Sequence, residues 1–307
     1  MKSFKLAISI VLALFLLDKL VFFCLLTMEK KVLSGEGIGK LNQFDLVKDT
    51  TKYVVFGNSR ANHHINPEVF GKSAYNIGVG GRKMAFSATL IQTLPKKKKQ
   101  FVLLQIDPVY VFDTTYVGSD IDALYVKYHQ NKIIKSKIDE IQRSNIFSLF
   151  FWSLDYNGLV FSILSNRFNP SYNYKHYNGY DPMVNSKEQK EMFTKRLKDL
   201  PQNKDCNKVY TASKLERMYL KQIKEFCAQN NKVLILFTSP VYKDNCKKDN
   251  EAMSKLMKEY GIKYYDFTDY FKNDGSIEYW KDENHLSKVG ADKFSLSLPN
   301  YFKNELK

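Results

Sequence analysis

Five short apolar runs alternate with amphipathic segments, and this alternation restricts the fold more than any other feature of the chain. Short apolar strands interleaved with helices are typical of a parallel sheet that is covered on both faces. The sequence therefore predicts an α/β domain. The predicted strands are Tyr53–Phe56, Ser73–Ile77, Phe101–Ile106, Val233–Thr238 and Lys263–Phe267, and the predicted helices include Lys83–Leu94, Lys132–Ile141, Lys214–Gln229, Asn250–Tyr260 and Lys288–Leu298.

A long apolar run, Leu6–Met28, precedes this pattern and has lysines on both sides. It is about 23 residues long, and about 20 are enough to cross a bilayer as a helix. Asp18 and Lys19 interrupt it, either pairing with each other or facing a protein partner. We favour an uncleaved signal anchor, a transmembrane helix within residues 1–31, because no small-residue cleavage site follows the run. A cleaved signal peptide and a buried helix of a soluble protein are the alternatives.

We expect residues 50–307 to form one domain, with an insertion at about 109–208 between the third and fourth strands. The insertion is rich in Tyr, Phe and Asn, as in the stretch 169–178. Long insertions at strand ends of α/β proteins commonly shape substrate sites. Its aromatic side chains could stack on sugar rings, or they could form a packing layer over the sheet, and the sequence does not decide between the two.

The chain carries 47 basic and 32 acidic residues, a formal charge of +15. Such a charge suits nucleic acid, an anionic membrane or an anionic polysaccharide. The predicted anchor and the lack of a recognisable nucleic-acid module argue against nucleic acid. No His, Cys and carboxylate cluster has metal-site spacing, so we expect neither a metal nor a cofactor.

Three short segments carry residues suited to nucleophilic chemistry. The first, Gly57-Asn58-Ser59-Arg60, follows the first strand directly. A serine there lies where open parallel sheets bind ligands, and a following helix would point its N–H groups toward the site. Taken alone, however, Asn-Ser after a strand is usually a helix cap.

The second segment, 75–82, contains Gly78, Gly80 and Gly81, and glycines let the backbone approach a ligand closely. It has no third glycine at the position that a dinucleotide loop requires, and a plain turn between strand and helix is the alternative. The third segment places Asp282 three residues before His285. At that spacing the carboxylate can orient the imidazole, leaving the other ring nitrogen as a base. The alternatives for this pair are a capped loop or a stray metal ligand.

The order of these segments resembles the SGNH (GDSL-like) hydrolase superfamily. The resemblance implies a flavodoxin-like three-layer α/β/α sandwich with Ser59 as nucleophile and His285 as base, oriented by Asp282. It also implies that the N–H of Gly81 helps to hold the oxyanion. The amino-terminal anchor resembles the membrane-anchored branch of the superfamily, which includes teichoic-acid D-alanylation and exopolysaccharide O-acetylation proteins.

One departure from the family pattern concerns the third strand. Its end, Leu104–Tyr110, lacks the Asn that the family uses as a second oxyanion donor. Either Asn58, Arg60 or His63 replaces that donor, or the enzyme is slow or inactive. His63 and His64 are otherwise expected at exposed positions.

These features lead to two hypotheses about function. The first is a membrane-anchored, extracytoplasmic serine esterase, of the carboxylesterase or deacetylase type, or an O-acyltransferase, acting on a cell-surface or exported polysaccharide. The second is a catalytically inactive carbohydrate-binding or assembly protein on the same fold. The expected partners are an acylated or acceptor glycan and the membrane. A transferase would also need a membrane acyltransferase partner, because no acetyl-CoA is available outside the cytoplasm, and Asp18 and Lys19 are candidates for docking it.

Overall fold

The computed structural model describes residues 2–141, 146–170, 177–198, 209–244 and 247–306. The chain forms two compact units. The helical unit comprises residues 1–43 and 121–174, and the sheet unit comprises residues 44–120 and 175–307. Residues 121–174, which lie within the expected insertion, group with the amino-terminal residues rather than with the sheet.

The sheet unit contains five parallel strands in the order β2-β1-β3-β4-β5. This is the strand order of flavodoxin-like folds. The predicted fold class is therefore confirmed, and each strand lies within about a residue of its predicted position. The strands are β1 (Tyr53–Phe56), β2 (Ala74–Asn76), β3 (Gln100–Gln105), β4 (Lys232–Thr238) and β5 (Lys263–Asp266).

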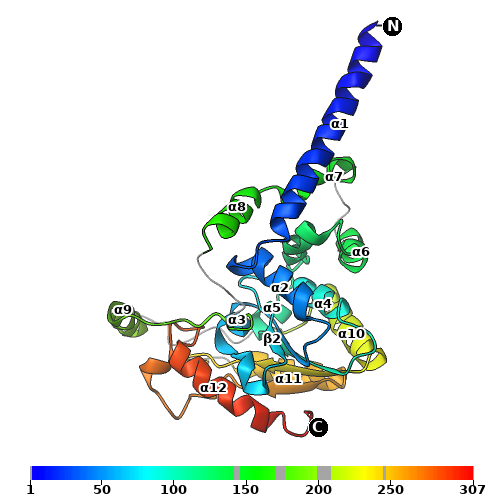
Figure 1. Cartoon of the computed structure of the whole chain (residues 1–307). Coiled ribbons are helices and arrows are strands. Elements are labelled where there is room, and N and C mark those ends of the chain that lie inside the picture. The colour runs from blue at the N-terminus through cyan, green and yellow to red at the C-terminus, as the bar shows by residue number, and fades with distance from the viewer. Residues whose placement is uncertain (1, 142–145, 171–176, 199–208, 245–246, 307) are drawn as a thin grey trace. The chain divides into compact units, whose positions relative to one another are not determined.

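Helices cover both faces of this sheet. Right-handed crossovers place α4 (Met84–Gln92), α10 (Lys214–Gln229) and α11 (Lys247–Glu259) on one face, and α3 (Ser59–His64) on the other. Accordingly, α4 packs against α10, whereas α3 packs against α12 (Lys288–Tyr301). Figure 1 shows α10 and α12 on different sides of the sheet. The central strand β3 is buried along its whole length, which is why it has no polar alternation.

The remaining elements of the sheet unit are short connections, apart from α9. They are η2 (Pro67–Phe70), α5 (Pro108–Val111), α9 (Lys187–Lys198) and η5 (Ile277–Tyr279), while α2 (Lys40–Val47) crosses the boundary between the two units.

In the helical unit, α1 (Lys2–Glu29) is long and apolar enough to span a membrane, a property that a signal sequence shares. Along α1, which the structure describes in full, only Asp18, Phe22 and Glu29 are buried. The alternative of a buried helix in a soluble protein does not fit this exposure. Figure 1 shows α7 and α8 beside the carboxyl-terminal half of α1. The other elements of the unit are η1 (Gly35–Gly39), α6 (Lys132–Ile141), α7 (Ile146–Phe150), η4 (Trp152–Tyr156) and α8 (Val160–Phe168), while η3 (Ser119–Lys127) begins in the sheet unit and ends in the helical unit.

The aromatic residues of the insertion are of two kinds. Tyr128 and Tyr156 in the helical unit, and Tyr180 in the sheet unit, are fully buried and pack as core residues. Phe147, Phe161 and other phenylalanines of the helical unit are exposed instead. Residues 171–176 of the stretch singled out above lie outside the described residues.

Candidate active site

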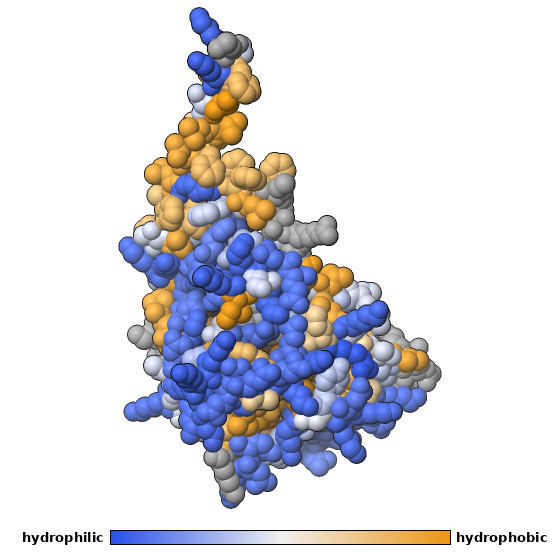
Figure 2. Space-filling model, turned by 90° about the vertical axis from the view of Figure 1, so that its right-hand side faces the viewer, coloured by the Kyte–Doolittle hydropathy of each residue, from blue (hydrophilic) through white to orange (hydrophobic). Residues whose placement is uncertain are grey.

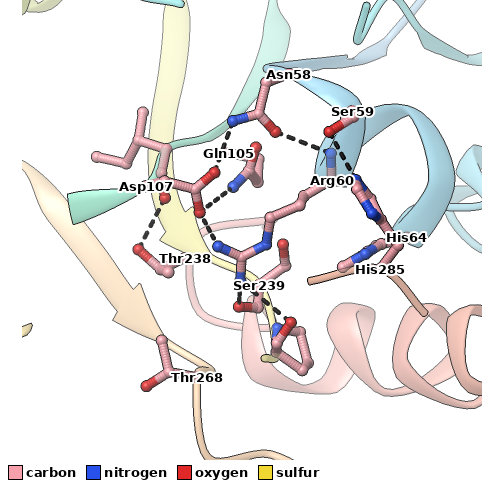
Figure 3. A network of polar contacts seen from close by, with 12 residues as sticks. Asn58, Ser59, Arg60, His64, Gln105, Asp107, Thr238, Ser239, Thr268 and His285 are labelled. Atoms are coloured by element: carbon pink, nitrogen blue, oxygen red, sulfur yellow. Dashed lines mark hydrogen bonds and ion pairs between the residues drawn. The ribbon is translucent and has the colours of Figure 1, made fainter. Parts of the chain in front are cut away.

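Ser59, His285 and Asp282 form a hydrogen-bonded chain at the carboxyl edge of the sheet. Ser59 Oγ lies 2.8 Å from His285 Nε2, and both Asp282 carboxylate oxygens lie 3.0 Å from His285 Nδ1. Figure 3 shows the serine directed at the imidazole. A carboxylate on Nδ1 favours the tautomer with its proton there, which leaves Nε2 free to accept the proton of Ser59.

The Asp282 carboxylate is prepared for this role by the loop that carries it. The backbone N–H groups of Asn284 and His285 donate to Asp282 Oδ1 at 2.8 and 2.9 Å. Burial would raise the pKa of Asp282, but the hydrogen bonds from His285 and from the loop backbone outweigh it and leave the pKa below its usual value. Asp282 is therefore ionised at neutral pH.

A sharp turn after β1 brings Ser59 to the site. Gly57 has φ of +143°, and a Cβ at this position would lie 2.8 Å from both the Gln105 carbonyl oxygen and the Ala61 Cβ. Asn58 then caps α3, since its side-chain oxygen accepts the N–H of Arg60 at 2.8 Å. The helix-cap role and the position beside His285 thus coexist, although the sequence presented them as alternatives.

Both neighbours of Ser59 are bound by Asp107, which follows β3 directly. Asp107 accepts hydrogen bonds from Asn58 Nδ2 at 2.6 Å and from Gln105 Nε2 at 3.0 Å, and it forms an ion pair with Arg60. The Arg60 guanidinium also donates to the carbonyl oxygens of Ser239 and Pro240 (Figure 3). Asp107 thus fixes the turn that presents the serine.

Sequence reasoning missed this role of Asp107. A signal was present, because β1 and β3 are neighbouring parallel strands and the residues that follow them meet at one edge.

The two histidines after Ser59 are buried, so the expectation that they are exposed is wrong. His64 is 0% exposed, and its Nε2 accepts the backbone N–H of Leu286 at 3.0 Å, which ties α3 to the loop that carries His285. Complete burial, with Arg60 and His285 nearby, holds the pKa of His64 well below its usual value. His64 is therefore neutral at pH 7.

His63 is 8% exposed and lies at the edge of the site. Its Nδ1 lies 2.7 Å from the carbonyl oxygen of Asp181. Its ring meets that of His285 edge-on, with 5.8 Å between the ring centroids.

The glycine segment after β2 packs against α3. Asn76 Nδ2 donates to the carbonyl oxygens of Ala61 and Ile65 at 2.7 and 2.8 Å, and a Cβ on Gly78 would lie 2.7 Å from that of Ala61. Gly81 is exposed and has φ of +71°. It lies in a turn in which the backbone N–H of Arg82 donates to the carbonyl oxygen of Val79 at 3.2 Å.

A cleft of 350 Å³ opens beside Ser59 and His285. Most of the residues that line it are polar or charged. Gly81 is not among the described residues that line it. Within the described ranges, no group of three or more His, Cys, Asp or Glu side chains is suited to a metal ion. The lining residues away from Ser59 include Tyr110, Lys243, Asp244, Asp249, Asn250, Thr268 and Asn284.

Comparisons with known proteins add little to this geometry. No family model and no curated protein matches the chain. Among solved structures, one described as "a putative platelet activating factor from Streptococcus pneumonia" matches with 14% identity, covering 99% of each chain at a TM-score of 0.32. At this TM-score the likeness carries no conclusion about the chain.

Proposed function

We propose that the chain is a membrane-anchored serine esterase or O-acyltransferase of the SGNH type, which acts on a cell-surface or exported polysaccharide. The observation that carries the proposal is the chain Ser59–His285–Asp282, whose 2.8 and 3.0 Å separations lie within the range for an activated serine. The flavodoxin-like strand order, with Ser59 directly after β1 and the Asp–His pair before the last helix, agrees with the family pattern.

In the proposed reaction, His285 Nε2 takes the hydroxyl proton while Ser59 Oγ attacks an ester carbonyl. The tetrahedral oxyanion faces the backbone N–H of Ser59 at the start of α3 and, by family resemblance, that of Gly81. Collapse of this intermediate forms an acyl-enzyme and expels the alcohol, which takes the proton from His285. Water or a sugar hydroxyl then accepts the acyl group, with His285 acting again as base.

The end of the third strand, residues 104–110, lacks the Asn that the family uses as a second oxyanion donor. The loss of one oxyanion donor costs about 2.7–4 kcal/mol in the barrier. Two of the expected substitutes are engaged elsewhere, since Asn58 Nδ2 and the Arg60 guanidinium both bind Asp107. His63 directs its Nδ1 to the Asp181 carbonyl. A slow enzyme is therefore expected unless a bound partner or substrate rearranges these groups.

The same observation favours a second candidate, a catalytically inactive carbohydrate-binding or assembly protein. A carboxylate, that of Asp107, follows the third strand where the family has an amide donor, yet the polar cleft is retained. Such a protein would bind glycan with equal affinity before and after Ser59→Ala.

The compartment follows from the anchor. We infer that α1 is an uncleaved single span and that the sheet unit lies outside the cytoplasm. An acyl transfer reaction there would require a membrane acyltransferase partner, because no acetyl-CoA is available outside the cytoplasm. The net charge of +15 suits an anionic membrane surface or polymer.

Fluorophosphonate labelling of the full chain in native membranes tests the serine chemistry without knowledge of the substrate. Labelling should be lost in Ser59→Ala and in His285→Ala, and retained in the matched control Ser239→Ala, a serine at the same sheet edge. Absence of wild-type labelling, with glycan binding that Ser59→Ala leaves intact, would refute the enzyme and support the binding protein.

A further inference from the structure

A second segment packs beside α1 and is bound to it at Asp18. The Asp18 carboxylate accepts the backbone N–H groups of Trp152 and Ser153 at 2.9 and 3.0 Å, and the Ser153 hydroxyl at 2.5 Å. Lys19 Nζ pairs with Asp18 at 2.9 Å and donates to the carbonyl oxygen of Phe150. The two charges that interrupt the apolar run are thus bound by a segment more than a hundred residues away in the sequence.

The Trp152 ring completes this contact. It lies 4.3 Å beneath Lys19 Nζ and 5.4 Å from the Phe22 ring, measured to the ring centroids. The described contacts of Asp18 and Lys19 thus come from α1 and from residues 150–153.

The position of Asp18 along α1 places this contact inside a bilayer. The apolar run begins at Leu6, so Asp18 lies about 18 Å along the helix, at about 1.5 Å per residue. The hydrocarbon core is about 30 Å thick. If α1 spans it, Asp18 lies about 12 Å below the surface of the leaflet nearer to the carboxyl end of α1. The segment that binds Asp18 must then lie at a similar depth.

The surface of that segment fits this depth. From Ile146 to Phe168 the charged residues are Asp155 and Arg167. Asp155 is 6% exposed and lies 3.3 Å from His129 Nε2, and Arg167 is exposed in the last turn of α8. Figure 2 shows hydrophobic surface on α1 and the residues next to it. Large apolar side chains point outward along the segment, namely Phe147, Leu149, Phe150, Leu154, Phe161 and Phe168, each at least 45% exposed.

A groove of 420 Å³ runs between α1 and this segment, and it is continuous with the exposed apolar side of α1. Leu14, Leu17 and Val21 form one wall, and Phe147 and Leu154 form the other. Its size and lining suit a lipid acyl chain.

We propose that α7, η4 and α8 insert into the bilayer leaflet beside α1, so that the protein is held by a span and a half-inserted helical segment stapled to it at Asp18. The occupant of the apolar surface is lipid. The inference rests on the proposed span of α1 and is independent of the serine chemistry. It also removes the need for a protein partner at Asp18 and Lys19.

The two tryptophans of the chain provide the test, because Trp152 lies in the segment and Trp280 lies in the core of the sheet unit at 2% exposure. The full chain carrying Trp280→Phe, which reports Trp152 alone, is reconstituted in phosphatidylcholine–phosphatidylglycerol vesicles with acyl chains brominated near their middle. The matched variant Trp152→Phe reports Trp280. Subtracting its signal from that of the wild type gives the Trp152 signal without altering the sheet core.

We expect brominated lipid to quench Trp152 severalfold more than Trp280, and aqueous iodide to quench neither strongly. Strong iodide quenching of Trp152 without lipid quenching, in a chain that resists carbonate extraction, would overturn the inference and leave the span of α1 standing. A surface that needs a protein partner would give this same result, because the vesicles contain none. Release of the chain by carbonate would overturn the span and the insertion together, whatever the outcome of fluorophosphonate labelling.

Discussion

Removal of the Asp107 carboxylate should unfold the turn that presents Ser59. In Asp107→Ala, the Arg60 guanidinium keeps its bonds to the Ser239 and Pro240 carbonyls but loses its counter-charge. The side chains of the pair are 10% and 5% exposed, so water cannot replace the lost partner without opening the structure.

The size of the effect follows from the kind of group that remains. Removing one partner of a buried ion pair typically costs about 3–5 kcal/mol, because the other charge stays buried and uncompensated. Asn58 and Gln105 also lose their acceptor, while the two carbonyls that still bind Arg60 reduce the loss. We therefore expect about 3–5 kcal/mol, a large share of the roughly 5–15 kcal/mol stability of a typical protein.

The assay is urea unfolding followed by Trp280 fluorescence in the Trp152→Phe background, so that only the sheet unit is observed. Asp113→Ala is the matched control, since its pair with Lys83 is about a quarter exposed and should contribute about 1 kcal/mol or less. Adding Arg60→Met to Asp107→Ala should recover part of the loss, because the buried charge is then gone. An Asp107→Ala protein as stable as the control, or a double variant no more stable than Asp107→Ala, would refute the reasoning.

Two further predictions concern the histidines and their partner. In Asp282→Asn the rate of fluorophosphonate labelling of Ser59 should fall by orders of magnitude, up to about 10⁴-fold as in other serine triads. The control variant Asp274→Asn, on an exposed loop, should be labelled at the wild-type rate. Equal rates in the two variants would contradict the orienting role of Asp282. Folding lowers the pKa of His64, so below the ordinary histidine pKa of 6.5 the unfolded chain binds a proton that the folded chain does not. The free energy of unfolding should therefore decrease as the pH falls below 6.5, by up to about 1.4 kcal/mol per pH unit. Urea midpoints between pH 7.5 and 5.5 should show this slope in the wild type and a shallower one in His64→Gln, and parallel slopes would contradict it.

The fold of the sheet unit was predictable because its signals are local. Each strand is a short apolar run with a turn residue at its end. β3 is buried on both faces, so its sequence is a continuous apolar run rather than an alternation of polar and apolar residues. The order of the strands is not a local property. It was reached through a family resemblance, and the observed β2-β1-β3-β4-β5 order agrees with that expectation.

The candidate site was predictable only in part, for a related reason. Ser59, Asp282 and His285 belong to short motifs with recognisable spacing. Asp107 and His64 do not, because what they do depends on contacts across long stretches of chain, to Asn58 and to Leu286 respectively. A strand-end aspartate and the second histidine of a pair look like surface residues until the elements that cover them are known.

The charges within the apolar run show how strongly the interpretation of one residue depends on a distant partner. By sequence alone, Asp18 and Lys19 are expected either to pair with each other or to face a protein partner, because a bare charge inside a bilayer is costly. Once the 150–153 backbone is placed beside Asp18, the same charge becomes a reason for that segment to stay with α1. In lipid, two backbone N–H groups without an acceptor would be as unfavourable as the unpaired carboxylate, so each side of this contact is stable only in the presence of the other.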